Sequence, residues 1–244
     1  MNRIGFGFLC FGEDYYYKGT ADKVQVLLNL GFNCYILTED VEYFNIHPNL
    51  YTTPYTKQYK SYYDKLTLTE LIFKNHKVAI IVDADAHILD YNWVQKLNTY
   101  NFKQGVSYIK TLSEHPSKRQ FIKDLISKDL DEWKPYVKYL ENIYPDYGNL
   151  NTIWEFFLII NKDGFNQEKF FEIYNTLQIA KEAGDLIAKK KVLGAGEGIS
   201  IQVSGKLSNT PVEQDLVLHE LLKDKIQSIS RKFVRPELWP DWMK

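Results

Sequence analysis

The chain has 244 residues, of which 45% are hydrophobic and 25% are charged, and its formal net charge is -1. This composition excludes disorder over most of the chain, because there is enough apolar surface to offset the loss of conformational entropy on folding. The near-zero net charge argues against a general nucleic-acid-binding protein, which needs an excess of Lys and Arg to neutralise phosphates.

The cysteines and the start of the chain predict a cytoplasmic protein. Cys10 and Cys34 lie in apolar runs and form no C-x-x-C pair, so we expect buried free thiols in a reducing compartment. The apolar run Ile4–Phe11 is interrupted by two glycines and is not followed by a small-residue cleavage site, unlike a signal peptide. No apolar stretch is long enough to span a bilayer, so we expect a soluble protein without a membrane span.

The first forty residues predict a strand–helix–strand unit. Ile4–Cys10 has the uninterrupted apolar character of a buried strand, and residues 11–19 are expected to form a loop. Thr20 is suited to cap a helix over Ala21–Leu30, and Phe32–Leu37 is a second apolar strand. A unit of this kind favours two parallel strands joined by a right-handed crossover.

Strands and helices continue to alternate after an irregular stretch at 41–58. We predict further strands at Val78–Val82, Gly105–Ile109 and Thr152–Ile160. We predict helices at Lys60–Asn75, Tyr91–Tyr100, Ser117–Asn142 and Gln167–Leu177, with a short one after the glycine-rich segment 194–198. No repeat or flexible linker divides the chain, so the pattern predicts a single α/β domain with a mostly parallel, twisted sheet flanked by helices.

Two aspartates follow the most strongly apolar strand. Val78–Val82 runs directly into Asp83-Ala84-Asp85. In open α/β sheets ligands bind at the carboxyl ends of strands, and alternation along an extended chain places both carboxylates on the same side. Two neighbouring carboxylates repel each other unless a cation shares them, and oxygen ligands suit Mg²⁺ or Mn²⁺. The alternative is a pair of solvated turn aspartates that cap the next helix.

The segment Lys77–Asp85 resembles the D-x-D segment of GT-A glycosyltransferases, which use nucleotide-sugar donors. Other stretches fit the family pattern in the same order along the chain: Ile4–Leu37 is similar to the unit that holds the nucleoside, Tyr62–Leu66 to the helix before the D-x-D strand, Trp154–Asn161 to a later strand, and Gly196–Gly198 to the segment where a polar or acidic pair opens a helix. The resemblance spans most of residues 3–220, and the D-x-D motif is its specific part.

The resemblance implies a single GT-A domain over residues 1–244. Its nucleotide-binding half would cover about residues 1–110. Residues 111–244 would form the acceptor-binding half and a C-terminal arm.

The same resemblance implies which residues bind the donor and the metal. Asp83 would contact the ribose and the metal, and Asp85 would bind the metal directly. Lys65 would send its basic side chain to the donor. Residues after the first two strands would hold the nucleotide, namely Phe11, Gly12, Tyr15 and Asp40.

A histidine is a further candidate metal ligand. His219 is the only late histidine in the chain, and many such enzymes take a ligand from a late histidine. A histidine on the surface of a helix within Leu216–Leu222 is the alternative. His87 is a rival, because it lies two residues past Asp85 on the same alternating face.

Two glutamates are candidates for the catalytic base. Glu155 is the single charge in an apolar run and is therefore expensive to bury unpaired, so it is either a structural partner or a functional group held in a cleft. Its neighbour Trp154 could stack on a sugar ring. Glu197 follows glycines and opens a helix, where it could contact a sugar or simply complement the helix dipole.

These features predict a metal-dependent glycosyltransferase that uses Mn²⁺ or Mg²⁺. It would move a sugar from a nucleotide-diphosphate donor, UDP-linked by the resemblance, to a carbohydrate or glycoconjugate hydroxyl. One alternative is a nucleotidyltransferase acting on sugar phosphates, although residues 12–18 are acidic and aromatic where such an enzyme needs a basic, glycine-rich loop. The other is a non-catalytic sugar-binding module, against which the intact Asp83 and Asp85 argue.

Overall fold

The computed structural model describes residues 3–55, 63–109, 134–150, 153, 155–188, 197–222 and 225–228. These residues contain a seven-stranded sheet in the order β3-β2-β1-β4-β7-β6-β8 and a separate two-stranded sheet of β5 and β9. The strands are β1 (Ile4–Cys10), β2 (Asn33–Thr38), β3 (Leu50–Pro54), β4 (Val78–Asp83), β5 (Ala86–Ile88), β6 (Gly105–Tyr108), β7 (Phe157–Asn161), β8 (Val212–Gln214) and β9 (Ile226–Ser228).

The large sheet is mostly parallel, as the sequence predicts. Neighbours β3, β2, β1 and β4 are all parallel, and so are β6 and β8. Among the described strands of this sheet, β7 alone runs the other way, antiparallel to both β4 and β6. Because β7 is reversed, the segment that leads into it lies beside the carboxyl end of β4.

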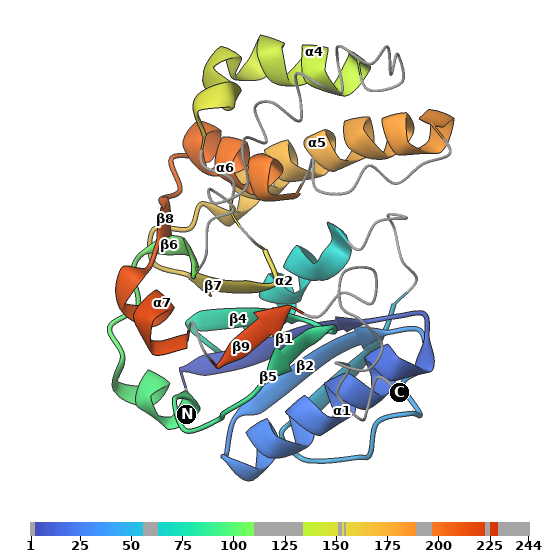
Figure 1. The fold of residues 1–244 in the computed structure, drawn as a ribbon, viewed down its shortest axis with the longest axis vertical. Coiled ribbons are helices and arrows are strands. Elements are labelled where there is room, and N and C mark those ends of the chain that lie inside the picture. Colours follow the sequence, from blue (N-terminus) through green and yellow to red (C-terminus); the bar gives the residue numbers. More distant parts are fainter. Residues whose placement is uncertain are drawn as a thin grey trace.

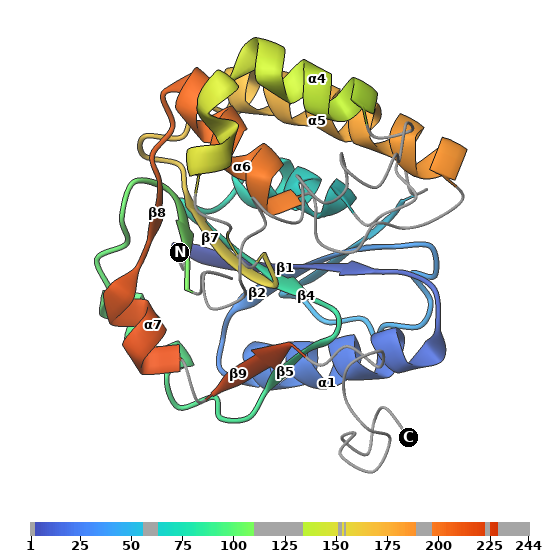
Figure 2. The same cartoon turned by 45° about the horizontal axis from the view of Figure 1, so that its top comes forward.

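Helices cover both faces of the sheet (Figure 1). The α-helices are α1 (Asp14–Asn29), α2 (Leu68–Ile72), α4 (Lys134–Ile143), α5 (Gln167–Ala188), α6 (Glu197–Ser208) and α7 (Leu216–Leu222), and the 3-10 helices are η1 (Tyr63–Thr67), η2 (Val94–Thr99) and η4 (Pro145–Asn149). Helix α1 and the β5–β9 pair lie on one side, whereas α2, α5 and α6 lie on the other with α4 outermost (Figure 2). No described helix has both the length and the apolar composition needed to cross a membrane.

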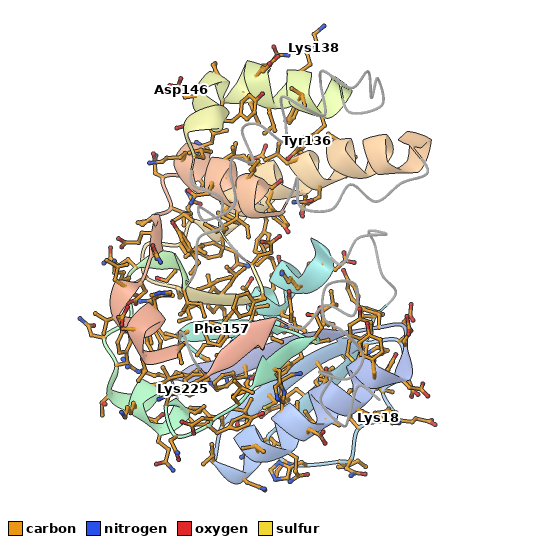
Figure 3. The ribbon with its side chains drawn as sticks, in the orientation of Figure 1. Lys18, Tyr136, Lys138, Asp146, Phe157 and Lys225 are labelled. Atoms are coloured by element: carbon orange, nitrogen blue, oxygen red, sulfur yellow. The ribbon has the colours of Figure 1, made fainter. Side chains whose placement is uncertain are left out.

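Alternating residues of the strands build two apolar cores. Phe6, Phe8 and Ile80 point to the α1 side, and Ala79 and Ile81 point to the α2 side. Figure 3 shows side chains filling the space between the layers, where Phe157 is fully buried, whereas Lys138 on α4 points outward. Both cysteines are free and buried, as predicted, and burial raises the pKa of the Cys10 thiol to about 12.

A glycine brings the η1–α2 segment close to the sheet. A Cβ atom at Gly7 would lie 2.8 Å from Cδ1 of Ile81 and 3.0 Å from Cδ1 of Ile72. A side chain at this position would have to displace the ends of both isoleucine side chains, so its absence lets α2 pack closely on β1. This close approach places η1, and Lys65 within it, against the end of β4.

Helix α1 begins earlier than predicted. The expected loop at 11–19 is helical from Asp14, and Thr20 is buried within the helix instead of capping it. Gly12 has a φ of 89°, a left-handed conformation that turns the chain sharply out of β1. Tyr15 and Tyr17 are buried, and their apolar contacts favour the helix over a loop.

Other differences concern short or irregular elements. Strands β3, β5, β8 and β9 are not predicted, because strands of three to five residues carry little periodic signal. The predicted helix at Tyr91–Tyr100 is the 3-10 helix η2, and the described part of the predicted helix at Lys60–Asn75 is η1 followed by α2. The strand predicted from Thr152 begins at Phe157. Residues 110–133 of the proposed acceptor half, Trp154 and the C-terminal arm from 229 lie outside the described residues.

Candidate active site

Several predicted site residues meet at one edge of the sheet. Strands β1, β2 and β4 are parallel, so their carboxyl ends lie side by side. Phe11 and Gly12 follow β1, Asp40 lies just past the end of β2, and Asp83 is the last residue of β4. Ligands of open α/β sheets bind at this edge, and we take it as the candidate active site.

The residues expected to bind the nucleotide are held by local contacts. Phe11 is buried, and its ring centroid lies 6.2 Å from that of Tyr55. The Tyr15 ring lies 4.0 Å from that of Tyr16. The Asp40 carboxylate accepts hydrogen bonds from the backbone N–H groups two and three residues later, at 3.1 and 3.2 Å, so this exposed turn is ordered.

Lys65 joins three parts of the chain at the end of β4. Its Nζ lies 2.8 Å from Oδ1 of Asp83 and donates a hydrogen bond of the same length to the carbonyl oxygen of Glu155. Lys65 is 4% exposed, and an ammonium group that is buried to this extent requires such partners. The backbone N–H of Asp83 donates to the carbonyl of Phe156 at 2.9 Å, which fixes the chain before β7 against the same aspartate.

A second buried lysine holds the turn after β4. The Nζ of Lys23, on α1, donates a 2.8 Å hydrogen bond to the carbonyl oxygen of Ala84, the residue between the two aspartates. Burial lowers the pKa of Lys23 to about 8, and Asp85 is the strongest influence in the opposite direction. Burial and the neighbouring Asp83 raise the pKa of Asp85 to about 7, while Lys23 and Lys65 act to lower it. Two carboxylates and two ammonium groups therefore share this small volume.

Lys23 is not among the predicted site residues, although the sequence holds a signal for it. Lys23 lies three residues after Thr20 and four before Leu27, and both of these are buried in α1. Residues at these spacings occupy one face of a helix, so Lys23 belongs to the buried stripe. A charged residue on such a stripe needs a polar partner, which the carbonyl of Ala84 provides.

The aspartate pair is the part of this edge that could hold a divalent cation. Asp83 keeps 29% of its side-chain surface exposed, and Asp85 is half-buried. No group of three or more His, Cys, Asp or Glu side chains with metal-binding geometry occurs among the described residues. A site of two protein carboxylates is typical of Mg²⁺, which completes its shell with water and phosphate oxygens.

The two candidate histidines occupy different surroundings. His219 lies on α7, and its Nδ1 is 2.5 Å from the carbonyl oxygen of Ile109, which follows β6 at the same edge of the sheet. Within the described part of the chain His219 forms no metal-binding cluster with the aspartates, and its role as a ligand stays a prediction. His87 lies on β5 opposite Gln227 of β9, and burial together with Lys23 lowers its pKa.

The structure places the two candidate glutamates on neighbouring segments. Glu155 lies in the turn before β7 with a half-buried side chain, so the cost of burial inside a strand does not apply to it. Glu197 is the first residue of α6, as predicted. A Cβ atom at Gly198 would lie 2.6 Å from the carbonyl oxygen of Ile153, so the start of α6 packs directly on the segment that leads to Glu155.

A cleft of about 340 Å³ opens at the opposite edge of the sheet. It is lined by residues next to the amino ends of β1 and β4 and by the residues around Phe102. The Lys77 ammonium group in this cleft is paired with Asp163 at 2.6 Å. The cleft is therefore separate from the aspartate turn, and none of the predicted site residues is among those that line it.

Comparisons with known proteins concern the fold of the chain. No protein-family model and no curated protein matches the sequence. Among solved structures, the chain is similar to an active-site mutant of LgtC, with a TM-score of 0.51 and 12% identity over 86% of this chain and 72% of that one. The galactosyltransferase LgtC in complex with donor and acceptor sugar analogues matches with a TM-score of 0.49 and 10% identity over the same shares of the two chains.

The glycosyltransferase GlyE of Streptococcus pneumoniae is also similar. The match has a TM-score of 0.47 and 11% identity, and it covers 91% of this chain but only 47% of GlyE, so the chain spans less than half the length of that protein. The match to the LgtC mutant and the mixed seven-stranded sheet confirm the predicted fold class. The chain has the GT-A fold.

Proposed function

We propose that the protein is a metal-dependent glycosyltransferase that moves a sugar from a nucleotide-diphosphate donor, a UDP-sugar, to a hydroxyl group of a carbohydrate or glycoconjugate. The observation that carries the proposal is the Asp83-Ala84-Asp85 turn at the carboxyl edge of a GT-A sheet, held by two buried lysines. This turn lies where open α/β sheets bind their ligands, and it offers the charges that a diphosphate and its metal ion require.

The residues present fit a divalent cation. Asp83 and Asp85 are hard oxygen donors, and the raised pKa of Asp85 reflects in part its repulsion by Asp83. A cation between them would relieve this repulsion, and we propose that these two residues hold Mn²⁺ or Mg²⁺. When bound, the ion would supply positive charge that stabilises the departing diphosphate.

The protein's own groups would orient the donor. Lys65 keeps the Asp83 carboxylate in one position and ties it to the backbone at Glu155. Phe11, Tyr15 and Asp40 lie at the carboxyl edge or the start of α1, where the nucleoside is expected in our proposal. His219 lies at the same edge of the sheet and is kept in this proposal as a further ligand.

Glu155 and Glu197 are the candidate general bases. If the reaction inverts the anomeric configuration, one of them would accept the proton of the acceptor hydroxyl. Glu155 is favoured because its backbone carbonyl shares Lys65 with Asp83, which places its segment next to the metal-binding turn. If configuration is retained, both glutamates could orient sugars.

The proposal is tested by measuring UDP binding through thermal stability. A ligand that binds only the folded state raises the unfolding midpoint, so UDP with Mn²⁺ should raise the Tm clearly more than UDP with EDTA. Asp85→Asn should abolish the Mn²⁺-dependent part of this shift. Equal stabilisation by UDP in Mn²⁺ and in EDTA would contradict a metal-dependent donor site.

Hydrolysis of the donor separates catalysis from simple binding. Incubation with UDP-glucose or UDP-galactose and Mn²⁺ should release UDP slowly in the absence of an acceptor, and the chelator should stop the release. Release of UDP identifies a glycosyltransferase, whereas binding without release identifies a sugar-binding module. Formation of pyrophosphate from UTP and a sugar phosphate would identify a nucleotidyltransferase.

A further inference from the structure

Lys23 is a buried cation whose position a stabilising role alone explains poorly. It lies on the inner face of α1, is 3% exposed, and uses its ammonium group to bind the backbone carbonyl at the centre of the aspartate turn. An uncharged apolar residue on this stripe would avoid the cost of removing a charge from water.

Two of the groups around Lys23 are the aspartates of the candidate site. The electrostatic neighbours of its ammonium group are Asp85, Cys10, Asp22 and Asp83. His87 on β5 is also within reach of this charge, because burial and then Lys23 lower the pKa of its ring. Lys23 therefore faces the turn from the α1 side, while Lys65 holds Asp83 from η1.

We propose that Lys23 is a positioning residue that also sets the charge of the site, so that a divalent cation binds tightly only together with an anionic diphosphate. The inference rests on the metal-dependent donor site proposed above. It adds to that proposal an electrostatic role for the Lys23 ammonium group beyond holding the turn.

The charge balance of the turn carries the argument. In the ionisation state that would bind a cation, both carboxylates are charged and both lysines are protonated, so Asp83, Asp85, Lys23 and Lys65 together carry no net charge. Asp22 is exposed, and solvent screens its charge. A free divalent cation is then attracted by the carboxylates and repelled by two fixed ammonium groups in surroundings of low dielectric constant. A diphosphate brings negative charge that both the cation and the lysines can share. Metal and nucleotide should therefore strengthen each other's binding, and by thermodynamic linkage the enhancement is the same in both directions.

The hydrogen bond of Lys23 adds the positioning role. The carbonyl of Ala84 lies between the two aspartates, so fixing it restricts the backbone of the turn that presents both carboxylates. A residue that only supported the turn would, when replaced, weaken binding of every ligand. A residue that also repels the free cation would, when replaced by a neutral one, strengthen binding of that cation. The two possibilities therefore predict changes of opposite sign in the affinity for the free cation when Lys23 is replaced by a neutral residue.

The experiment is a titration of Mn²⁺ followed by the electron paramagnetic resonance signal of the free ion, with and without UDP. In the wild-type protein, UDP should strengthen Mn²⁺ binding by at least about tenfold, and UDP binding measured by calorimetry should gain the same factor from Mn²⁺. Lys23→Met should bind Mn²⁺ about tenfold more tightly than wild type in the absence of UDP, and its enhancement by UDP should shrink. Lys23→Arg keeps the charge and should retain the weak binding of the free ion.

The outcomes distinguish this inference from the function on which it rests. Wild-type protein that binds UDP equally well with and without Mn²⁺ would refute the metal-dependent donor site. Where the wild-type protein shows the coupling, the variants decide the role of Lys23: a Lys23→Arg protein that binds free Mn²⁺ as tightly as Lys23→Met would overturn it. A folded Lys23→Met protein, verified by circular dichroism, that binds free Mn²⁺ no more tightly than wild type would overturn it as well.

Discussion

Replacing Lys65 by Met tests whether the candidate site is built around a buried ion pair. Met preserves most of the volume of the side chain but removes the ammonium group, and with it the hydrogen bonds to Asp83 and to the carbonyl of Glu155. Each hydrogen bond to a charged group is worth about 1.5–3 kcal/mol, and breaking a buried pair leaves the partner charge uncompensated. Asp83 keeps 29% of its side chain exposed, and water offsets part of this loss.

We therefore expect Lys65→Met to lower the free energy of unfolding by about 2–4 kcal/mol. For a domain of this size, 1 kcal/mol corresponds to about 2–4 °C, so the Tm should fall by roughly 4–16 °C. The assay is urea unfolding followed by tryptophan fluorescence, supported by a thermal scan. A double-mutant cycle with Asp83→Asn should give a coupling energy of about 1–2 kcal/mol for the pair.

Lys103→Met is the matched control. The Lys103 ammonium group also has two such partners. It donates a 2.9 Å hydrogen bond to the carboxylate of Glu213 and a 3.2 Å hydrogen bond to the backbone carbonyl of Gln214. Both side chains of that pair are well exposed, and a surface pair contributes only about 0–1 kcal/mol. Equal losses from Lys65→Met and Lys103→Met would refute the argument that burial gives the Lys65 contacts their weight.

Three further predictions concern the site. Glu155→Gln should lower transfer by at least about 100-fold and leave Mn²⁺-dependent UDP binding unchanged; near-normal transfer would shift the role of base to Glu197, whose Gln variant is the matched control. Gly198→Ala should lower the free energy of unfolding by about 1–3 kcal/mol, because the added Cβ would lie 2.6 Å from the carbonyl oxygen of Ile153. The measurement is urea unfolding, and an unchanged unfolding midpoint would contradict this prediction. Burial and Asp83 raise the pKa of Asp85 to about 7, so protonation of this carboxylate should compete with metal binding. The affinity for Mn²⁺ should therefore fall about tenfold from pH 8 to pH 6. An affinity that does not change with pH, or that changes equally in Asp85→Asn, would argue against Asp85 as a ligand.

The α/β class and the aspartate turn could be predicted from local patterns. Val78–Val82 is an uninterrupted apolar run that ends in two carboxylates, and such a run is typical of a strand covered on both faces. The strand–helix–strand pattern of the first forty residues likewise favours a parallel pair, because the crossover that joins parallel strands has a fixed hand. These predictions needed only neighbours in sequence, and the structure confirms the parallel strands on which they depend.

The short strands and the contacts of the two lysines could not be predicted in this way. Strand β5 exists because β9, about 140 residues later, pairs with it beside the D-x-D turn, and three residues carry no periodic signal of their own. The reversal of β7 places the segment of Glu155 next to Asp83, and no local pattern indicates its direction.

The sequence by itself therefore determined which strand carries the carboxylates and that both lie at its carboxyl end. The tertiary structure alone decided what surrounds them. Helical spacing places Lys23 on a buried stripe, but the sequence around Lys23 and Lys65 does not indicate which groups their ammonium groups contact. Each becomes a buried partner of the turn only because α1 and η1 pack on opposite faces of the sheet and bring residues 61 and 18 positions apart in the chain within 2.8 Å.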